Sequence, residues 1–188
     1  MANIQFDEVI VIAGCGPIGL GMIAASKQKS PKFIVALDFF DAKLDLAREC
    51  GADFCFNPEK VNVQAEIETL TEGYGCDTYF EVTGNPKSVQ QGLDLLTRRG
   101  KFICMSVFKN SDVNADWSLI GDVKELQIIG GHLGPHCWPK AISMVSKNQL
   151  PLDKIITHKF PLSEFDKGIK MVVKGSESIK VMLYMDPK

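Results

Sequence analysis

Three glycines and one aspartate form the spacing in this chain that is best suited to chemistry. Gly14, Gly16 and Gly19 stand in the string G-C-G-P-I-G, directly after the apolar run 8–13. Asp38 closes the next apolar run, nineteen residues after Gly19. A strand that turns sharply into a helix points free backbone N–H groups and a positive dipole end at a pyrophosphate. The spacing therefore predicts a dinucleotide-binding turn.

Each glycine of the motif has its own expected task. Gly14 permits the tight turn, Gly16 lets the backbone approach the phosphates, and Gly19 lets the helix lie close to the strand. Pro17 and Ile18 complete the motif, and we expect them to bind the cofactor with the glycines. A lone motif of this kind also occurs in ordinary loops, but here a strand precedes it, a helix follows it and the acidic residue is present.

Asp38 indicates which dinucleotide is bound. A carboxylate at this place can accept hydrogen bonds from both hydroxyls of an adenosine ribose, and it repels a 2′-phosphate. The residues that follow, Phe39 and Phe40, include no arginine that would hold such a phosphate. The sequence therefore favours NAD over NADP. The alternative interpretation is a solvated carboxylate at the end of a strand.

Short apolar runs alternate with helix-like segments along residues 1–149. The strand candidates are 8–13, 32–37, 54–56, 77–82, 101–107 and 127–130. The helix candidates are 18–29, 41–50, 63–70, 86–96 and 139–147. An irregular surface loop is expected over 110–117, and Trp117 and Leu119 are expected to anchor the segment that follows it. This rhythm predicts an α/β fold of the Rossmann type, a doubly wound parallel sheet of six strands.

The alternation changes after Leu150. A short strand at 157–160, a helix at 164–173 and a last strand at 179–185 form a C-terminal extension. We therefore expect a NAD-binding domain over 1–149 and a separate C-terminal segment over 150–188.

Composition excludes several classes of function. The chain has 188 residues, 45% of them hydrophobic, and a net charge of −2, which suits one substantial core. Its 21 basic and 23 acidic residues include no basic cluster, so a nucleic-acid partner is not expected. No apolar stretch reaches the roughly 18 residues of a membrane span, and no secretory signal is visible. The expected location is the cytoplasm.

The six cysteines include no C-x-x-C pair, so they are interpreted as reduced packing residues. His132, His136 and Cys137 have a spacing, H-x-x-x-H-C, that can reach one metal ion from a loop. A turn rich in glycine and proline also carries such residues for local hydrogen bonds. We favour that second interpretation and expect no metal site.

Further motifs connect the chain to a known family. They are V-I-A-G-C-G-P-I-G-L-G, A-L-D-F-F-D-A-K-L-D-L-A-R-E-C-G-A-D, E-V-T-G-N-P, G-K-F-I-C-M-S-V, and T-H-K-F-P-L followed by S-I-K-V-M-L. With them the chain resembles, over nearly all of its length, the cofactor-binding part of the medium-chain, zinc-dependent alcohol and polyol dehydrogenases.

The resemblance implies further cofactor-binding residues. Lys43 is implied to hold the adenosine ribose, although an exposed helix lysine is the alternative. Val82, Thr83 and Gly84 are implied to pass close to the ribose and phosphates, although Gly84 also suits a plain turn. The segments that are implied to hold the nicotinamide carboxamide through their main chain contain Ser106, Val107, Gly131 and His132.

The resemblance also implies the reaction. In the complete enzyme, zinc polarises an alcohol oxygen and NAD accepts a hydride, with a short polyol as substrate. The stretches D-W-S-L-I-G-D-V-K-E-L and G-G-H-L-G-P-H-C-W-P look most like oxidisers of erythritol and threitol. Leu133 stands where sorbitol-type enzymes carry an arginine. The family's zinc ligands precede the glycine motif and are not in this chain, so we expect it to bind NAD without turnover and to supply no catalytic residue.

Two other functions remain open at this point. One is a stand-alone NAD-sensing module, which requires a C-terminal segment that packs closed without an apolar patch. The other is a methyltransferase, which also uses a glycine-rich turn and an acidic residue on a ribose. If a domain is missing, Phe160, Phe165, Val181 and Leu183 should lack partners and favour pairing with a second chain. We expect a homo-oligomer, either a dimer or a tetramer.

Overall fold

The structure is a computed structural model that describes residues 2–109, 112–132, 134, 136–175 and 178–186. The chain divides into two compact units, Met1–Cys137 and Trp138–Lys188, which are described separately. The helix α5 (Trp138–Ser146) belongs by compactness to the second unit, whereas the sequence pattern assigned it to the first domain.

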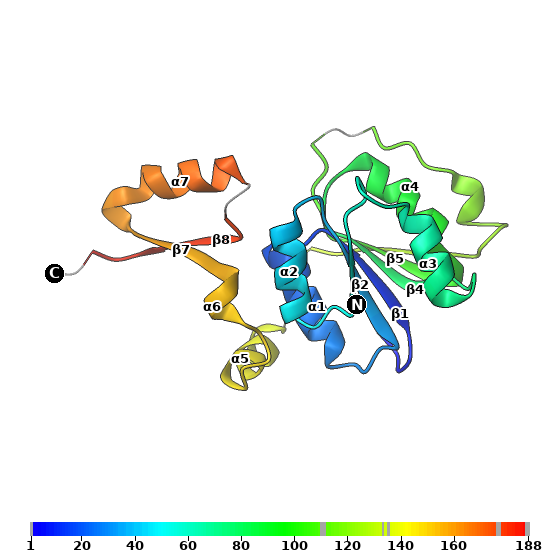
Figure 1. Cartoon of the computed structure of the whole chain (residues 1–188), viewed down its shortest axis with the longest axis horizontal. Coiled ribbons are helices and arrows are strands. Elements are labelled where there is room, and N and C mark those ends of the chain that lie inside the picture. The colour runs from blue at the N-terminus through cyan, green and yellow to red at the C-terminus, as the bar shows by residue number, and fades with distance from the viewer. Residues whose placement is uncertain (1, 110–111, 133, 135, 176–177, 187–188) are drawn as a thin grey trace. The chain divides into compact units, whose positions relative to one another are not determined.

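The first unit is built on the expected six-stranded sheet. Its strands are β1 (Val9–Ala13), β2 (Phe33–Leu37), β3 (Phe54–Phe56), β4 (Cys76–Glu81), β5 (Leu96–Cys104) and β6 (Gln127–Gly130). They run parallel in the order β3-β2-β1-β4-β5-β6. The doubly wound α/β fold is therefore confirmed (Figure 1).

Helices cover both faces of this sheet. They are α1 (Pro17–Lys27), α2 (Asp41–Glu49), α3 (Val63–Thr71) and α4 (Pro86–Leu95). In Figure 1, α1 and α2 lie on one face and α3 and α4 on the other. All five residues of β1 are buried because both of its faces are covered. Val9 and Val11 pack into the core cluster that contains Ile67 of α3 and Leu93 of α4.

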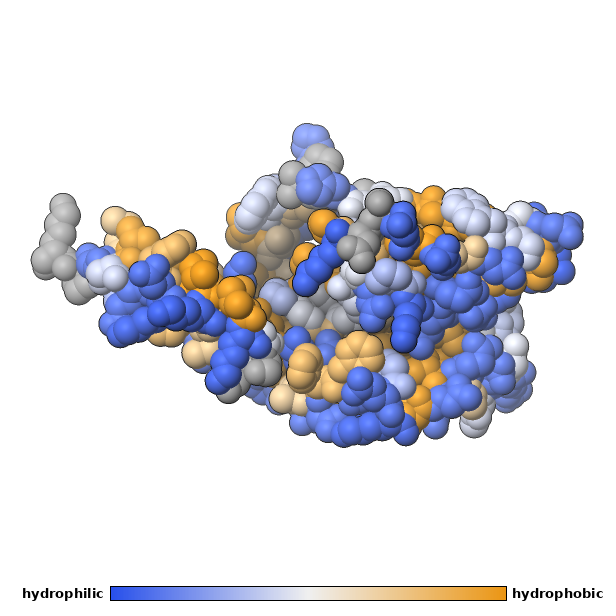
Figure 2. Space-filling model, turned by 90° about the horizontal axis from the view of Figure 1, so that it is seen from above, coloured by the Kyte–Doolittle hydropathy of each residue, from blue (hydrophilic) through white to orange (hydrophobic). Residues whose placement is uncertain are grey.

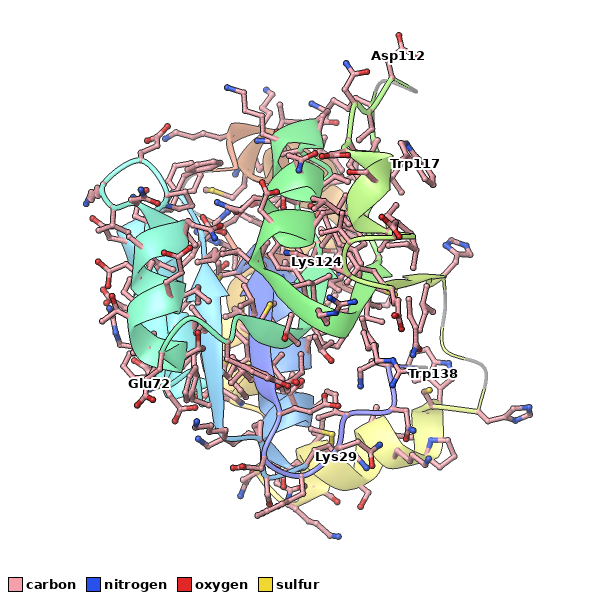
Figure 3. All side chains as sticks on the ribbon, turned by 90° about the vertical axis from the view of Figure 1, so that its right-hand side faces the viewer. Lys29, Glu72, Asp112, Trp117, Lys124 and Trp138 are labelled. Atoms are coloured by element: carbon pink, nitrogen blue, oxygen red, sulfur yellow. The ribbon has the colours of Figure 1, made fainter. Side chains whose placement is uncertain are left out.

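β5 differs from its expected bounds. The sequence predicts a strand over 101–107, but β5 begins at Leu96 and ends at Cys104. Lys124 explains the early start, since its Nζ donates to the carbonyl oxygens of Leu93, Asp94 and Leu96 at 2.8, 2.7 and 2.7 Å. These bonds satisfy carbonyls that the end of a helix leaves free, so the chain passes from α4 directly into a strand. Lys124 approaches this end of α4 in Figure 3, and burial lowers its pKa.

The loop before β6 also departs from expectation. A 3₁₀ turn, η1, covers Trp117–Leu119, while 110–111 lie outside the described residues. Trp117 is 74% exposed and does not anchor the segment that follows the loop, which corrects that prediction. Leu119 does pack against the core.

The second unit contains a small parallel sheet. After α5 come α6 (Leu152–Ile155), β7 (Ile156–Pro161), the 3₁₀ turn η2 (Leu162–Glu164), α7 (Phe165–Lys174) and β8 (Lys180–Tyr184). β7 pairs with β8, and α7 packs on both strands.

Several apolar side chains of the second unit remain exposed. Phe165 and Leu183 are exposed, while Phe160 and Val181 are half-buried near Gly168 of α7. Figure 2 shows orange patches on this unit. The segment therefore does not pack closed in the way that a self-sufficient sensing module requires.

Substituting Gly92 tests the packing of α4 on the sheet. The rings of Tyr79 and Phe102 stack with centroids 5.6 Å apart, and a Cβ added at Gly92 would lie 2.5 Å from the Tyr79 ring. We expect Gly92→Ala to lower the free energy of unfolding by about 1–3 kcal/mol, because overpacking outweighs the helix propensity of alanine. Urea denaturation measures this change in the free energy of unfolding. Gly21→Ala in α1, where nothing lies within 4 Å, is the matched control and should not destabilise the chain. Equal midpoints for the two variants would contradict the packing argument.

Candidate functional site

The strand order itself creates a cleft at one edge of the sheet. β2 and β4 flank β1 on opposite sides, so the chain leaves the carboxyl ends of β1 and β4 in different directions. Open α/β sheets bind ligands at such a switch point. A cleft of about 840 Å³ lies there. Six of the residues expected to bind the cofactor line it, namely Gly14, Gly16, Asp38, Lys43, Val82 and Thr83.

The glycine turn is shaped by close approaches of the backbone. Gly14 has a φ of +104°, and its N–H donates to the Leu37 carbonyl at 2.8 Å. A Cβ added at Gly19 would lie 1.8 Å from the Gly14 carbonyl oxygen, so α1 rests directly on the turn. At Gly16, the N-cap of α1, an added Cβ would meet nothing within 4 Å. The space in front of Gly16 is therefore open to a ligand.

Asp38 fastens the turn to the start of α2. Its Oδ2 accepts a hydrogen bond from the Cys15 N–H at 2.8 Å, and its Oδ1 accepts one from the Phe40 N–H at 3.0 Å. Each carboxylate oxygen can accept more than one bond. Asp38 therefore retains acceptor capacity for hydroxyl groups in the cleft that it lines.

Cys15, inside the glycine turn, packs rather than reacts. Its side chain is buried, and its Sγ lies 3.6 Å from the Leu37 carbonyl oxygen. Burial, and then the Asp38 charge, raise the pKa of the Cys15 thiol. A thiol held in its protonated form is a poor nucleophile.

The mouth of the cleft carries a cation and aromatic rings. Lys43 Nζ lies 4.7 Å from the centre of the Phe40 ring. Phe39 and Phe40 are both nearly half exposed and line the cleft, which offers a flat apolar surface to a base. The sequence interpretation did not include them as binding residues, although two aromatic residues directly after Asp38 were a usable signal.

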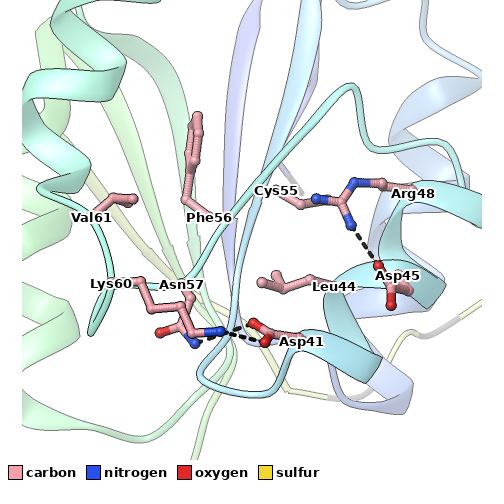
Figure 4. A pocket seen from close by; sticks show the side chains of 9 residues that line it. All are labelled: Asp41, Leu44, Asp45, Arg48, Cys55, Phe56, Asn57, Lys60 and Val61. Carbon is pink, nitrogen blue, oxygen red and sulfur yellow. Dashed lines mark hydrogen bonds and ion pairs between the residues drawn. The ribbon is translucent and has the colours of Figure 1, made fainter.

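The outer wall of the cleft is tied to α2. The Asn57 amide donates to the Phe39 carbonyl at 2.8 Å, and Lys60 pairs with Asp41, whose pKa this bond lowers. Figure 4 shows these side chains around a neighbouring pocket of about 330 Å³. Its charged groups are paired with one another, as in the contact of Arg48 with Asp45 at 2.7 Å. The pocket therefore supports the wall rather than forming a second ligand site.

The remaining expected residues do not line the cleft. Gly84 packs against the segment after β5, since a Cβ there would lie 2.6 Å from the Val107 carbonyl oxygen. The Gly131 N–H donates to the Cys104 carbonyl at 2.8 Å, just past β6. Four further expected residues are not among those that line the cleft, namely Pro17, Ile18, Ser106 and His132. Their roles stay predictions.

The cleft also contains residues from α4 and the loop before it. Asn85, Lys87, Ser88 and Gln91 line it, and the sequence interpretation named none of them. The Ser88 hydroxyl is 2.8 Å from the hydroxyl of the buried Tyr79. Only folding brings this helix beside the glycine turn.

The described residues contain no group of three or more histidine, cysteine or acidic side chains that would hold a metal ion. His132, His136 and Cys137 are all described and do not form such a group, although 133 and 135 between them are not described. Nor does any described helix have both the length and the apolarity needed to cross a membrane.

Comparison with known proteins shows which protein family the chain matches. The family model described as zinc-binding dehydrogenase matches residues 17–147. The chain is 52% identical over 182 residues to an erythritol/L-threitol dehydrogenase of Mycolicibacterium smegmatis, covering 97% of this chain and 50% of that protein. The chain spans about half the length of the curated relatives it matches.

Solved structures agree in fold. A 2R,3R-butanediol dehydrogenase of Bacillus subtilis superposes with a TM-score of 0.89 at 27% identity, over 98% of this chain and 53% of that one. An alcohol dehydrogenase of Escherichia coli, solved in complex with the cofactor NADH, superposes with a TM-score of 0.87 at 21% identity, over 96% and 53% of the two chains. At that lower identity the likeness concerns the fold alone.

Proposed function

The chain belongs to the zinc-binding dehydrogenase family, and from that premise we propose that it is the NAD-binding half of an enzyme that oxidises a secondary alcohol of a short polyol to a ketone. One observation supports this most strongly. The cleft combines an open space in front of Gly16, at the start of α1, with the Asp38 carboxylate beside it. A pyrophosphate and an adjoining ribose need those two features next to each other.

Different residues of this chain hold different parts of NAD. The N–H groups at the start of α1 face the pyrophosphate, and Asp38 accepts bonds from the adenosine ribose, with Lys43 beside it. The Val82–Gly84 turn contacts the ribose and phosphates, while the main chain around Ser106, Val107, Gly131 and His132 holds the nicotinamide end. When bound, NAD supplies the hydride acceptor of the reaction.

Zinc does not fit the residues that the structure describes. The described part offers no group of three ligands, so no step of the reaction is derived through a metal here. We place the zinc ligands of the complete enzyme outside this chain. The isolated chain should therefore bind NAD, retain no stoichiometric zinc and oxidise no polyol.

Calorimetry and activity measurements test this proposal together. Titration with NADH should give saturable binding near one equivalent, while incubation with NAD and erythritol or threitol should give no NADH absorbance. The complete protein should oxidise such polyols with zinc bound. Absence of any heat with NADH, against binding of S-adenosylmethionine, would favour the methyltransferase interpretation. Robust polyol oxidation by the isolated chain would refute the proposal that this chain binds NAD but does not catalyse the reaction alone.

We further propose that the complete enzyme is a cytoplasmic homo-oligomer. β6 is an edge strand of the six-stranded sheet, and its Ile128 is 46% exposed. An exposed edge strand is suited to pairing with another chain. Buried free thiols such as Cys15 and Cys76 agree with a reducing compartment. Sedimentation velocity of the complete protein should give a dimer or tetramer, and a monomer at high concentration would contradict it.

A further inference from the structure

A buried carboxylate lies at the end of β4, and none of the proposed cofactor contacts uses it. Glu81 is the last residue of that strand and has no exposed surface. Among the described residues, no ion pair includes it. A buried carboxylate without a cation is tolerated only when hydrogen-bond donors surround it.

The donors come from two separate segments. Oε1 accepts the N–H of Thr83 at 2.8 Å, the N–H of Gly84 at 3.2 Å and the Thr83 hydroxyl. Oε2 accepts the Ser106 hydroxyl, and it lies 3.3 Å from the Gly84 nitrogen. The first segment is the turn after β4, and the second follows β5. One carboxylate therefore joins two loops at the cofactor edge of the sheet.

The connection continues into α4. The Thr83 hydroxyl oxygen accepts the N–H of Asn85 at 2.9 Å, and the Asn85 side chain accepts the N–H of Lys87 at 3.0 Å. The backbone adds a parallel link, since the Met105 N–H donates to the Glu81 carbonyl at 3.0 Å. Displacement of the Glu81 carboxylate would therefore loosen several contacts at once.

We propose that Glu81 is a positioning residue, whose carboxylate fixes the Ser106 segment against the Thr83–Gly84 turn so that the two ends of NAD are held at a set separation. This inference rests on the proposed NAD site, in which the turn contacts the ribose and phosphates and the Ser106 segment holds the nicotinamide. Glu81 itself touches neither part.

Glu81→Gln weakens the link between the two loops, while the shape of the side chain hardly changes. The amide has one oxygen, and the backbone N–H groups of Thr83 and Gly84 can only donate to it. The NH₂ group must then face Ser106, which loses its charged acceptor. We expect the Kd for NADH to rise about tenfold, while the Kd for ADP-ribose, which lacks the nicotinamide, changes less than about twofold. Calorimetry on the full chain measures both.

Ser106→Ala removes the same bond from the other side. It should raise the Kd for NADH by a similar factor, and the double variant should lose no more than either single variant. If Glu81→Gln does not fold, Ser106→Ala alone decides the question, because it must then weaken binding of NADH while leaving binding of ADP-ribose unchanged. Additive losses in the double variant would overturn the proposal.

Glu8→Gln is the matched control. Glu8 lies just before β1, at the amino ends of the strands and so opposite the carboxyl ends where Glu81 lies. Its carboxylate accepts bonds from Lys101 Nζ at 2.7 Å and from the Thr78 hydroxyl at 3.1 Å. Glu8→Gln should lower the Tm and leave both affinities unchanged. If folded Glu81→Gln binds both ligands like the unaltered chain, or loses both equally, Glu81 does not position the nicotinamide end. If the unaltered chain binds no NADH, the proposed function fails first.

Discussion

Gly19→Ala is expected to abolish measurable NADH binding and to destabilise the first unit. The added Cβ would lie 1.8 Å from the Gly14 carbonyl oxygen and 2.9 Å from its carbon, and both are backbone atoms that no side-chain rotation can move. Either α1 must shift away from the sheet or the turn must open. We expect a loss of about 3 kcal/mol in the free energy of unfolding. We expect at least about a 100-fold loss of affinity, because the N–H groups that we propose to bind the phosphates move with α1.

Two neighbouring glycines separate the loss of fold from the loss of binding. At Gly16 an added Cβ meets no protein atom, so Gly16→Ala should change the free energy of unfolding by less than about 1 kcal/mol. Its methyl group would occupy the proposed path of the phosphates, so NADH affinity should still fall at least tenfold. Gly21→Ala, on the same helix, should leave NADH affinity unchanged. Calorimetry and urea denaturation give both quantities for each variant.

Comparison of the three variants shows which of the glycines is needed for folding and which for binding of the cofactor. If Gly19→Ala binds NADH as well as Gly21→Ala does, the turn is not the phosphate cradle. If Gly16→Ala keeps full affinity while remaining folded, the open space in front of it is not used by the cofactor.

Local rules account for what the sequence predicted well. The turn at Gly14 depends on a few consecutive residues, and its positive φ is a property that a glycine pattern indicates directly. The six parallel strands follow from apolar runs separated by crossover-length segments. Asp38 directly follows β2, and the fold brings it beside the glycine turn because β2 neighbours β1.

Contacts between distant segments account for what the sequence did not predict. β5 begins early because Lys124 reaches back to the end of α4. Trp117 does not become buried, since the loop around it stays at the surface and Leu119 makes the core contact instead. The part played by Glu81 depends on Ser106, which lies 25 residues further along the chain. A glutamate at the end of an apolar strand was a signal, but its partners were not visible in the sequence.

Asp38→Ala should change which dinucleotide the chain prefers. The substitution removes the acceptor proposed for the ribose hydroxyls and releases the Cys15 and Phe40 N–H groups. The two hydrogen bonds that the ribose hydroxyls would lose are bonds to a charged group and cost about 3 kcal/mol together. This corresponds to about a 100-fold rise in the Kd for NADH. The Kd for NADPH should rise much less, because the repulsion of its 2′-phosphate is removed together with the carboxylate and Lys43 lies beside that place.

The ratio of the two dissociation constants is the decisive quantity. A general loosening of the turn would weaken NADH and NADPH equally and leave the ratio unchanged, whereas loss of a ribose contact must reduce the preference for NADH by at least about tenfold. Asp45→Asn is the control, because this carboxylate is 72% exposed on α2 and pairs with Arg48 outside the cleft. It should alter neither constant. An unchanged ratio in Asp38→Ala would mean that Asp38 only supports the turn, and the preference for NAD would then have to arise from other groups of the cleft.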